Sequence, residues 1–154
     1  MLPELKTFLI AMSPIVELRG SIPLAIEIYG LSPWSAYLWS VLGNITPIIF
    51  IILFLNKLSD YLIHNVYFFN RFFIWLFERT RRNFDKKLKY WDELALFVFV
   101  AIPLPMTGVW AGTAAAFIFG IKLKKSFPLI VLGSAAAGLI VLFLTLGVSF
   151  IFGY

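Results

Sequence analysis

Two long uncharged runs divide this chain into membrane-like blocks. Residues 34–56 and 126–150 hold apolar and small side chains and no formally charged one. A helix needs about 20 such residues to cross the hydrocarbon core of a bilayer. The pattern therefore predicts two membrane-spanning helices, at 34–56 and at 126–150.

Two further apolar segments, residues 13–30 and 94–120, are interrupted by residues that break helices. Proline removes a backbone hydrogen-bond donor and glycine tolerates a tight turn. Broken backbone at membrane depth is stable only where protein or a wet cavity covers it. We therefore predict two re-entrant hairpins whose tips meet in the middle of the fold. The breakers are Pro14, Gly20 and Pro23 in the first segment and Pro103, Pro105, Gly108 and Gly112 in the second.

The placement of basic residues favours hairpins over four full crossings. If all four apolar segments crossed, the loop at 121–126, with three lysines, would lie opposite the basic middle of the chain. Basic loops gather on the cytoplasmic side of a membrane. With hairpins at 13–30 and 94–120, both basic segments share one face. We expect a multi-pass cell-membrane protein with residues 57–93 and the 121–126 loop in the cytoplasm.

The charged middle, residues 57–93, links the two membrane blocks. It holds eight basic and five acidic side chains, a net charge of +3. Polar residues recur along one helical face while apolar and aromatic residues fill the others, which predicts an amphipathic interfacial helix. The polar stripe consists of Asp60, His64, Arg71 and Glu78. Since no second histidine or cysteine accompanies His64, we expect a surface residue and no metal site there.

Composition agrees with a membrane protein. The chain is 61% apolar and 14% charged, with a mean hydropathy of +0.92, whereas soluble domains carry about 25% charged residues. The net charge of +5 comes from Lys and Arg beside the spans, which fix orientation and attract anionic lipids, so we expect no nucleic-acid partner. Cysteine is absent, and no phosphate loop, nucleophile elbow or zinc signature occurs. We therefore expect no enzyme activity, no catalytic residue and no cofactor.

The two membrane blocks resemble each other in the spacing of their glycines. Gly20, Gly30 and Gly43 in the first block are spaced much like Gly108, Gly120 and Gly133 in the second. A small polar residue follows the last glycine of each of these sets, Asn44 after Gly43 and Ser134 after Gly133. We therefore predict one all-α membrane domain, residues 1–154, built as an inverted repeat of a re-entrant hairpin plus a transmembrane helix, in which residues 1–56 and 94–154 are the two repeats.

Glu17 and Arg19 are the strongest functional candidates. Each is an ionisable group in an otherwise apolar segment, and a charge at the bilayer centre costs at least about 2.5 to 3.5 kcal/mol, so it normally has a partner or a task. Two residues apart on a helix they would point away from each other, whereas an irregular segment can bring them together. Three readings stay open: a functional site, a structural pair, and a snorkelling interface pair.

Several weaker candidates accompany this pair. Glu27 lies nearer the loop, and a carboxylate in low dielectric disfavours its charged form, so Glu17 or Glu27 is able to exchange a proton. The second hairpin offers freed backbone, the Thr107 hydroxyl and the start of a half-helix that attracts anions. Asn44 is expected to bond across helices. The candidate substrate- or ion-binding residues are Glu17, Arg19, Gly20, Pro23, Glu27, Asn44, Pro103, Pro105, Thr107 and Gly108.

The motif at 17–25 (ELRGSIPLA) and the motif at 102–108 (IPLPMTG), followed by Trp110-Ala111-Gly112, resemble the small multidrug export family of prokaryotic membrane proteins. The second block is more distantly similar to the DedA and VTT superfamily, with its proline-containing re-entrant segment and Ala-Gly pair. The resemblance implies two facing hairpins and a role in moving small molecules or lipid carriers. The chain departs from the DedA pattern because Thr107 and Val109 stand where that pattern has an arginine.

These features favour a transporter or exporter of small molecules with a midplane site between the hairpins. Glu17 would titrate a proton or bind a cation there, with Arg19 as its partner or as an anion anchor. A DedA-like lipid scramblase or polyprenyl-phosphate flippase and a non-transporting membrane scaffold are the alternatives. The expected partners are membrane lipids, a small-molecule or lipid substrate, and further copies of the chain, because two spans and two hairpins enclose little volume.

Overall fold

The computed structural model describes residues 2–65, 86–104, 107–119 and 121–152, and within these ranges every regular element is helical. The elements are α1 (Pro3–Ala11), α2 (Glu17–Pro23), a π-helix η1 (Leu24–Ile28), α3 (Pro33–Ile45), α4 (Pro47–Asn65), α6 (Lys86–Ala101), α7 (Val109–Ile118) and α8 (Leu123–Phe152). The expected all-helical class is confirmed for these residues. Most of the expected interfacial helix at 57–93 lies outside them.

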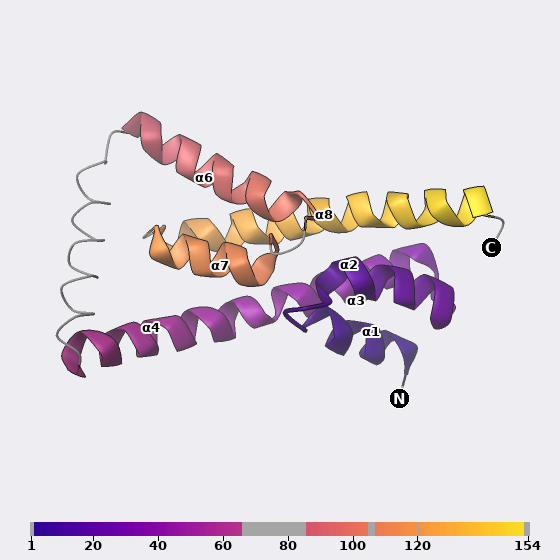
Figure 1. The fold of residues 1–154 in the computed structure, drawn as a ribbon, viewed down its shortest axis with the longest axis horizontal. Coiled ribbons are helices and arrows are strands. Elements are labelled where there is room, and N and C mark those ends of the chain that lie inside the picture. The colour runs from indigo at the N-terminus through magenta and orange to yellow at the C-terminus, as the bar shows by residue number, and fades with distance from the viewer. Residues whose placement is uncertain (1, 66–85, 105–106, 120, 153–154) are drawn as a thin grey trace.

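Two long rods form the frame of the molecule (Figure 1). One is α3 followed by α4, and the other is α8, which runs in the opposite direction. Proline at position 47 has no N–H for the carbonyl of Gly43, so the first rod bends where α3 meets α4. Residues Pro33–Leu55 and Leu123–Ile151 are long and apolar enough to cross a membrane. They coincide with the two spans expected at 34–56 and 126–150.

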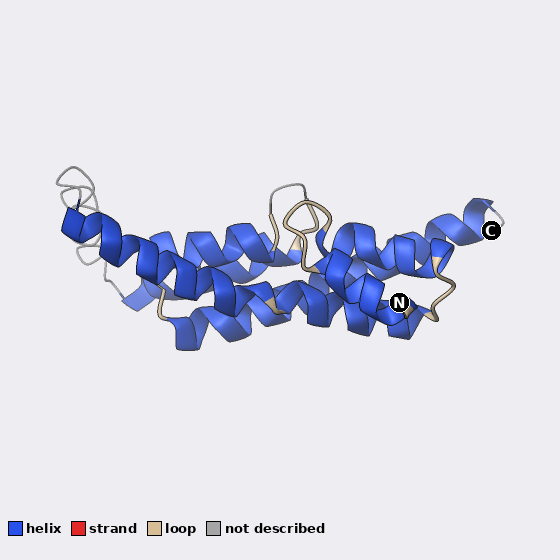
Figure 2. Cartoon of the chain, turned by 90° about the horizontal axis from the view of Figure 1, so that it is seen from below, coloured by secondary structure: helices blue, strands red, loops and turns tan. Residues whose placement is uncertain are grey.

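A pair of shorter helices packs on each half of this frame. In one half, α1 and α2 pack on α3, and α2 also contacts α8; in the other half, α6 packs on α8 and α7 on α4. The turns that join α1 to α2 and α6 to α7 both lie near the middle of the long axis (Figures 1 and 2). The N-terminus, the loop before α3 and the C-terminus lie at one end, and the start of α6 lies at the other.

The first arm of each helix pair begins earlier than the sequence pattern indicated. The arm α1 begins at Pro3 rather than near residue 13, with proline in the first helical position, where its missing N–H costs nothing. The arm α6 begins at Lys86 rather than near residue 94. Lysine and leucine are good helix formers, so the charged residues before the apolar stretch continue the helix instead of ending it.

Apolar packing is divided between the two halves. One core cluster, in the half of α6 and α7, contains Ile48, Leu96, Val100, Val109, Ala116 and Ile130. The other, in the half of α2, contains Leu18, Ile22, Ala137, Val141 and Leu142. Large apolar side chains also cover the outside of the rods, for example Phe50, Phe143 and Phe150, which are 65%, 68% and 89% exposed. An outer surface of this kind suits a hydrocarbon solvent.

Each rod contains a glycine where a short arm crosses closely. A Cβ on Gly43 would overlap the Phe8 carbonyl of α1 and lie 2.9 Å from the Ala11 Cβ. A Cβ on Gly133 would lie 2.9 Å from the Val100 Cβ and 3.0 Å from the Phe97 carbonyl of α6. In both places a hydrogen atom lets two helix backbones approach, as small residues do in membrane helix pairs.

Alanine at Gly43 is therefore expected to lower the melting temperature of the protein in detergent. Overlap with a backbone carbonyl cannot be relieved by a rotamer change, and overpacking of this kind costs about 1–3 kcal/mol. Gly147→Ala, in α8, is the matched control, because a Cβ there meets nothing within 4 Å and alanine favours the helix by about 1 kcal/mol. Equal melting temperatures for the two variants would contradict the close crossing of α1 and α3.

Candidate functional site

The turn between α1 and α2 is held by a local serine motif. The Ser13 hydroxyl accepts hydrogen bonds from the backbone N–H groups of Ile15 and Val16, at 3.3 and 3.4 Å. Serine hydroxyls commonly stabilise turns in this way. The turn directs the chain into Glu17, the first residue of α2.

Glu17 has the only positive φ among the non-glycine residues that the structure describes, at 50°. A bulky residue rarely occupies this region, and the strain, of order 1–3 kcal/mol, persists where the surroundings hold it and often at functional sites. The residue is also buried, with 6% of its surface exposed. Its carboxylate is thus placed by a strained backbone instead of by a regular helix.

The Glu17 carboxylate points at the start of α7. Gly108 is the N-cap of α7, and a Cβ added to it would overlap both carboxylate oxygens of Glu17. The backbone N–H of Trp110, in the first turn of α7, is near the same carboxylate. Free N–H groups and the helix dipole favour a negative charge at this end of a helix. α2 therefore supplies a carboxylate at the N-terminus of α7.

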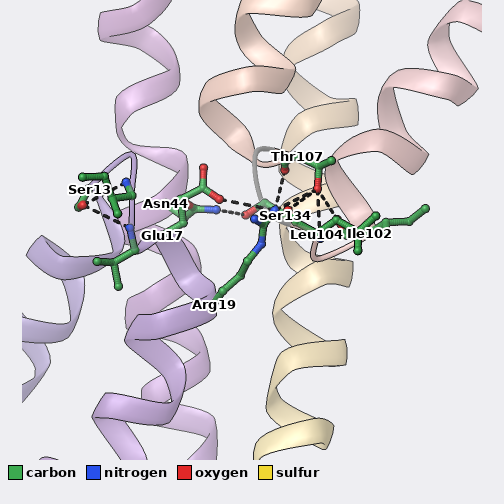
Figure 3. A network of polar contacts seen from close by, with 10 residues as sticks. Ser13, Glu17, Arg19, Asn44, Ile102, Leu104, Thr107 and Ser134 are labelled. Atoms are coloured by element: carbon green, nitrogen blue, oxygen red, sulfur yellow. Dashed lines mark hydrogen bonds and ion pairs between the residues drawn. The ribbon is translucent and has the colours of Figure 1, made fainter.

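Arg19 reaches across to the second turn from the same helix (Figure 3). Its Nη2 donates to the Thr107 carbonyl oxygen at 2.7 Å and to the Thr107 hydroxyl at 3.1 Å. The guanidinium also lies 3.7 Å from the Glu17 carboxylate, with side-chain exposures of 22% and 8% for Arg19 and Glu17. Glu17 and Arg19 are partners, and both face the turn between α6 and α7.

Thr107 organises the second turn. Its hydroxyl oxygen lies 2.7 and 2.8 Å from the carbonyl oxygens of Ile102 and Leu104 and accepts the Leu104 N–H at 3.2 Å. Proline at 103 has no N–H to offer, so these side-chain bonds replace helical ones where α6 ends. One residue therefore holds both the shape of the second turn and the guanidinium of the first.

Contacts between the turns run in both directions. The Trp110 indole N–H, from α7, donates to the Met12 carbonyl at 3.3 Å. Arg19, from α2, donates to Thr107. We call the set of Glu17, Arg19, Thr107, Gly108 and Trp110 the tip site. It joins two segments about 90 residues apart in the chain, and any change in the distance between the turns must break these contacts.

A buried polar pair joins the two rods. The Asn44 side-chain amide of α3 donates to the Ser134 hydroxyl of α8 at 3.0 Å (Figure 3). Asn44 is 1% exposed and Ser134 is 0% exposed. These two residues directly follow Gly43 and Gly133, the glycines at which the arms cross. The expected bond across helices is present, and its partner is Ser134, which the sequence pattern marked only as a small residue.

The structure does not bring all ten candidate residues together. Glu17, Arg19, Thr107 and Gly108 meet in the tip site, and Pro103 belongs to the turn that presents Thr107. Gly20 packs on Val16 within its own helix. Pro23 and Glu27 line a groove beside α8, away from the tips. Pro105 lies outside the described residues.

Sequence reasoning missed two participants. Trp110 stood in the sequence analysis only as part of the family motif, but its indole N–H donates to the Met12 carbonyl in the turn before α2. Ser134 was the other. The repeated glycine-polar pairs at 43–44 and 133–134 were the signal that pointed to it.

Comparison with known proteins gives one result. No curated protein and no solved structure matches the chain. A family model described as Putative small multi-drug export protein matches residues 17–140, a range that begins at Glu17 and contains the whole tip site. The matched range covers most of the sequence, including all of α3 and α4 and the first part of α8, so this membrane protein belongs to that small multi-drug export family.

Proposed function

We propose that this chain exports small molecules across the membrane and that the tip site is where substrate or coupling ion binds. The observation that carries the proposal is the buried, strained Glu17, whose carboxylate faces both Arg19 and the N-terminus of α7. An ionised group held at that cost in an apolar protein usually serves binding or transport. The family description points to the same class of function.

We further propose that the fold is an inverted repeat of two re-entrant hairpins, α1–α2 and α6–α7, each followed by a span. Three features support it. Gly43 packs on α1 as Gly133 packs on α6. Asn44 bonds to Ser134, which follows the corresponding glycine, and equivalent residues meet each other only beside a two-fold axis. The two turns contact each other at mid-length.

The tip site offers a charge-dependent latch. Glu17 interacts with Arg19 and with the N–H groups at the start of α7 because it is negatively charged. A proton or a cation bound at the carboxylate cancels that charge and weakens both interactions at once. The turns then separate at lower cost and the two halves of the fold are able to move relative to each other, as the repeats of alternating-access transporters do.

A second candidate function, flipping of lipid phosphates, is favoured by one contact. The DedA pattern has an arginine after the second proline motif, where this chain has Thr107. Arg19 of the first hairpin places its guanidinium on Thr107. A guanidinium at this position is suited to bind a phosphate, since its donors match phosphate oxygens in pairs.

Reconstitution of the purified chain into liposomes tests the proposal directly. With a pH gradient, wild-type vesicles should move fluorescent organic solutes faster than empty vesicles, and a labelled phospholipid should stay in its leaflet. Movement of the labelled lipid without any gradient would contradict solute export and support lipid flipping instead. If neither solute nor lipid moves, the chain is not a transporter.

Single cysteines introduced at Ser35 and Lys124 are expected to label from opposite faces of the membrane. Ser35 and Lys124 belong to the first turns of α3 and α8, and these two helices begin at opposite ends of the long axis (Figure 1). The absence of native cysteine makes the labelling unambiguous. In intact cells a membrane-impermeant maleimide should modify Ser35→Cys and spare Lys124→Cys, because basic loops stay in the cytoplasm. Modification of Lys124→Cys from outside would reverse the proposed orientation.

A further inference from the structure

A second carboxylate lies in a groove between η1 and the C-terminal half of α8. The groove has a volume of about 370 Å³. Its lining residues are Pro23, Glu27, Val141, Leu144, Thr145, Val148 and Ser149. Glu27 is its only charged lining residue, and the walls are otherwise apolar apart from two hydroxyls. The C-terminal half of α8, which forms one wall of the groove, lies on the half of the molecule that carries both termini (Figure 1).

The backbone around Glu27 departs from an α-helix. Residues Leu24–Ile28 form a π-helix, in which the Tyr29 N–H bonds to the Leu24 carbonyl at 3.1 Å. Pro23 directly precedes it and has no N–H, so the regular ladder ends there. A π turn holds an extra residue and changes the direction of the side chains that follow, and such turns occur often at functional sites.

The Glu27 carboxylate is positioned but not neutralised by its neighbours. The Ser149 hydroxyl of α8 donates to it, and this serine lies one helical turn beyond Thr145, the other hydroxyl in the groove. Within the described part of the chain the ion pairs are Arg19 with Glu17 and Lys125 with Glu93, and neither involves Glu27. An exposed negative charge therefore stands beside apolar walls without a basic partner from those residues.

We propose that this groove binds lipophilic organic cations. The apolar walls would hold the hydrocarbon part, and Glu27 would hold the positive charge, which fits the general design of a small-molecule site with few polar groups on apolar walls. The groove is separate from the tip site. A role for the groove as the last binding site on the export path rests on the proposed function. Binding of the cation does not.

Charge is the property that separates this occupant from a lipid acyl chain. Tetraphenylphosphonium and tetraphenylborate have nearly the same size, shape and apolar surface but opposite charge. A groove that holds hydrocarbon only would take both ions equally. A groove that uses Glu27 would prefer the cation, because the carboxylate attracts one ion and repels the other.

Equilibrium binding in phosphatidylcholine nanodiscs tests the proposal. The background should be Glu17→Gln, so that the tip site contributes no carboxylate. In this background we expect saturable binding of tetraphenylphosphonium and much weaker binding of tetraphenylborate. Adding Glu27→Gln should weaken cation binding about fivefold or more, as expected for one partly exposed charge contact. Adding Glu93→Gln, which neutralises a carboxylate at the other end of the molecule, should leave it unchanged.

Glu27→Asp keeps the charge and should retain most of the binding, which separates a lost charge from a damaged helix. Equal binding of the two ions, or unchanged cation binding in Glu27→Gln, would overturn the groove as a cation site. A protein that binds the cation at Glu27 yet moves no solute in liposomes would keep this inference and remove the proposed function. If Glu27→Gln protein still transports solute and binds the cation with full affinity, the proposed function stays and the groove is not a cation site.

Discussion

Glu17→Gln protein is expected to fold like the wild type and to move solute no faster than empty liposomes. Glutamine has the shape of glutamate and keeps a side-chain oxygen that can face the Trp110 N–H. It removes the charge that faces Arg19 at 3.7 Å and the start of α7. Charge at a helix N-terminus contributes about 0.3–1 kcal/mol when exposed and up to about 2 when partly buried.

The loss of that stabilisation is offset because a neutral amide is cheaper to bury than a carboxylate. We therefore expect the free energy of unfolding to change by no more than about 1 kcal/mol. Flux behaves differently, since in the proposed mechanism the cycle depends on a carboxylate that alternates between a charged and a neutralised state. A glutamine is always neutral, so the charge-dependent contacts between the two turns cannot form again and the cycle stops.

Glu93→Gln is the matched control for this experiment. It makes the same chemical change in an ion pair, since Glu93 Oε1 lies 2.7 Å from Lys125 Nζ, but that pair joins α6 to α8 away from the tips. Exposed pairs contribute less than about 1 kcal/mol, so stability and flux should both stay near wild type. Wild-type flux in Glu17→Gln vesicles would exclude Glu17 from the mechanism.

The spans were predictable because they rest on one property, the absence of charge over more than 20 residues. Three of the expected breakers, Pro14, Pro103 and Gly108, stand at or beside the turns, whereas Gly20 and Pro23 lie inside α2 and Gly112 lies inside α7. Helix starts were less accessible, because Lys86 begins α6 outside the apolar stretch and only contacts with α8 define that arm. Polar residues at the end of a membrane helix do not show where it begins.

The sequence pattern predicted that the two halves meet, but not which side chains join them. Periodicity describes one segment at a time, so it gave Glu17 and Arg19 as a possible pair but not Arg19 on Thr107, 88 residues away. The positive φ of Glu17 brings Glu17 and Arg19 into contact. The sequence does not predict this backbone conformation, because glutamate rarely adopts a positive φ. The sequence does not predict the π-helix around Glu27 either, although Pro23 marks where the regular α-helical hydrogen bonding ends.

Gly108→Ala should destabilise the protein and abolish transport, and truncation of Glu17 should remove most of the stability loss. The backbone tolerates alanine, because Gly108 is extended at φ −132° and ψ −161°. The problem is the Cβ, which would overlap the Glu17 carboxylate. Thr107, the adjacent residue, is fixed by Arg19, so the turn cannot simply shift away. Overpacking at such a contact costs about 1–3 kcal/mol.

A double-mutant cycle isolates this overlap. In the Glu17→Ala background the Cβ of Ala at 108 has space, so Gly108→Ala should cost at least about 1 kcal/mol less there than in the wild type, a coupling typical of residues in contact. Melting temperatures in one detergent give the four stabilities. Transport should be absent in both single variants and in the double variant, since all three lack an intact tip site. Additive costs would mean that the two turns do not touch, because only contact couples residues 91 positions apart, and the latch would lose its structural basis.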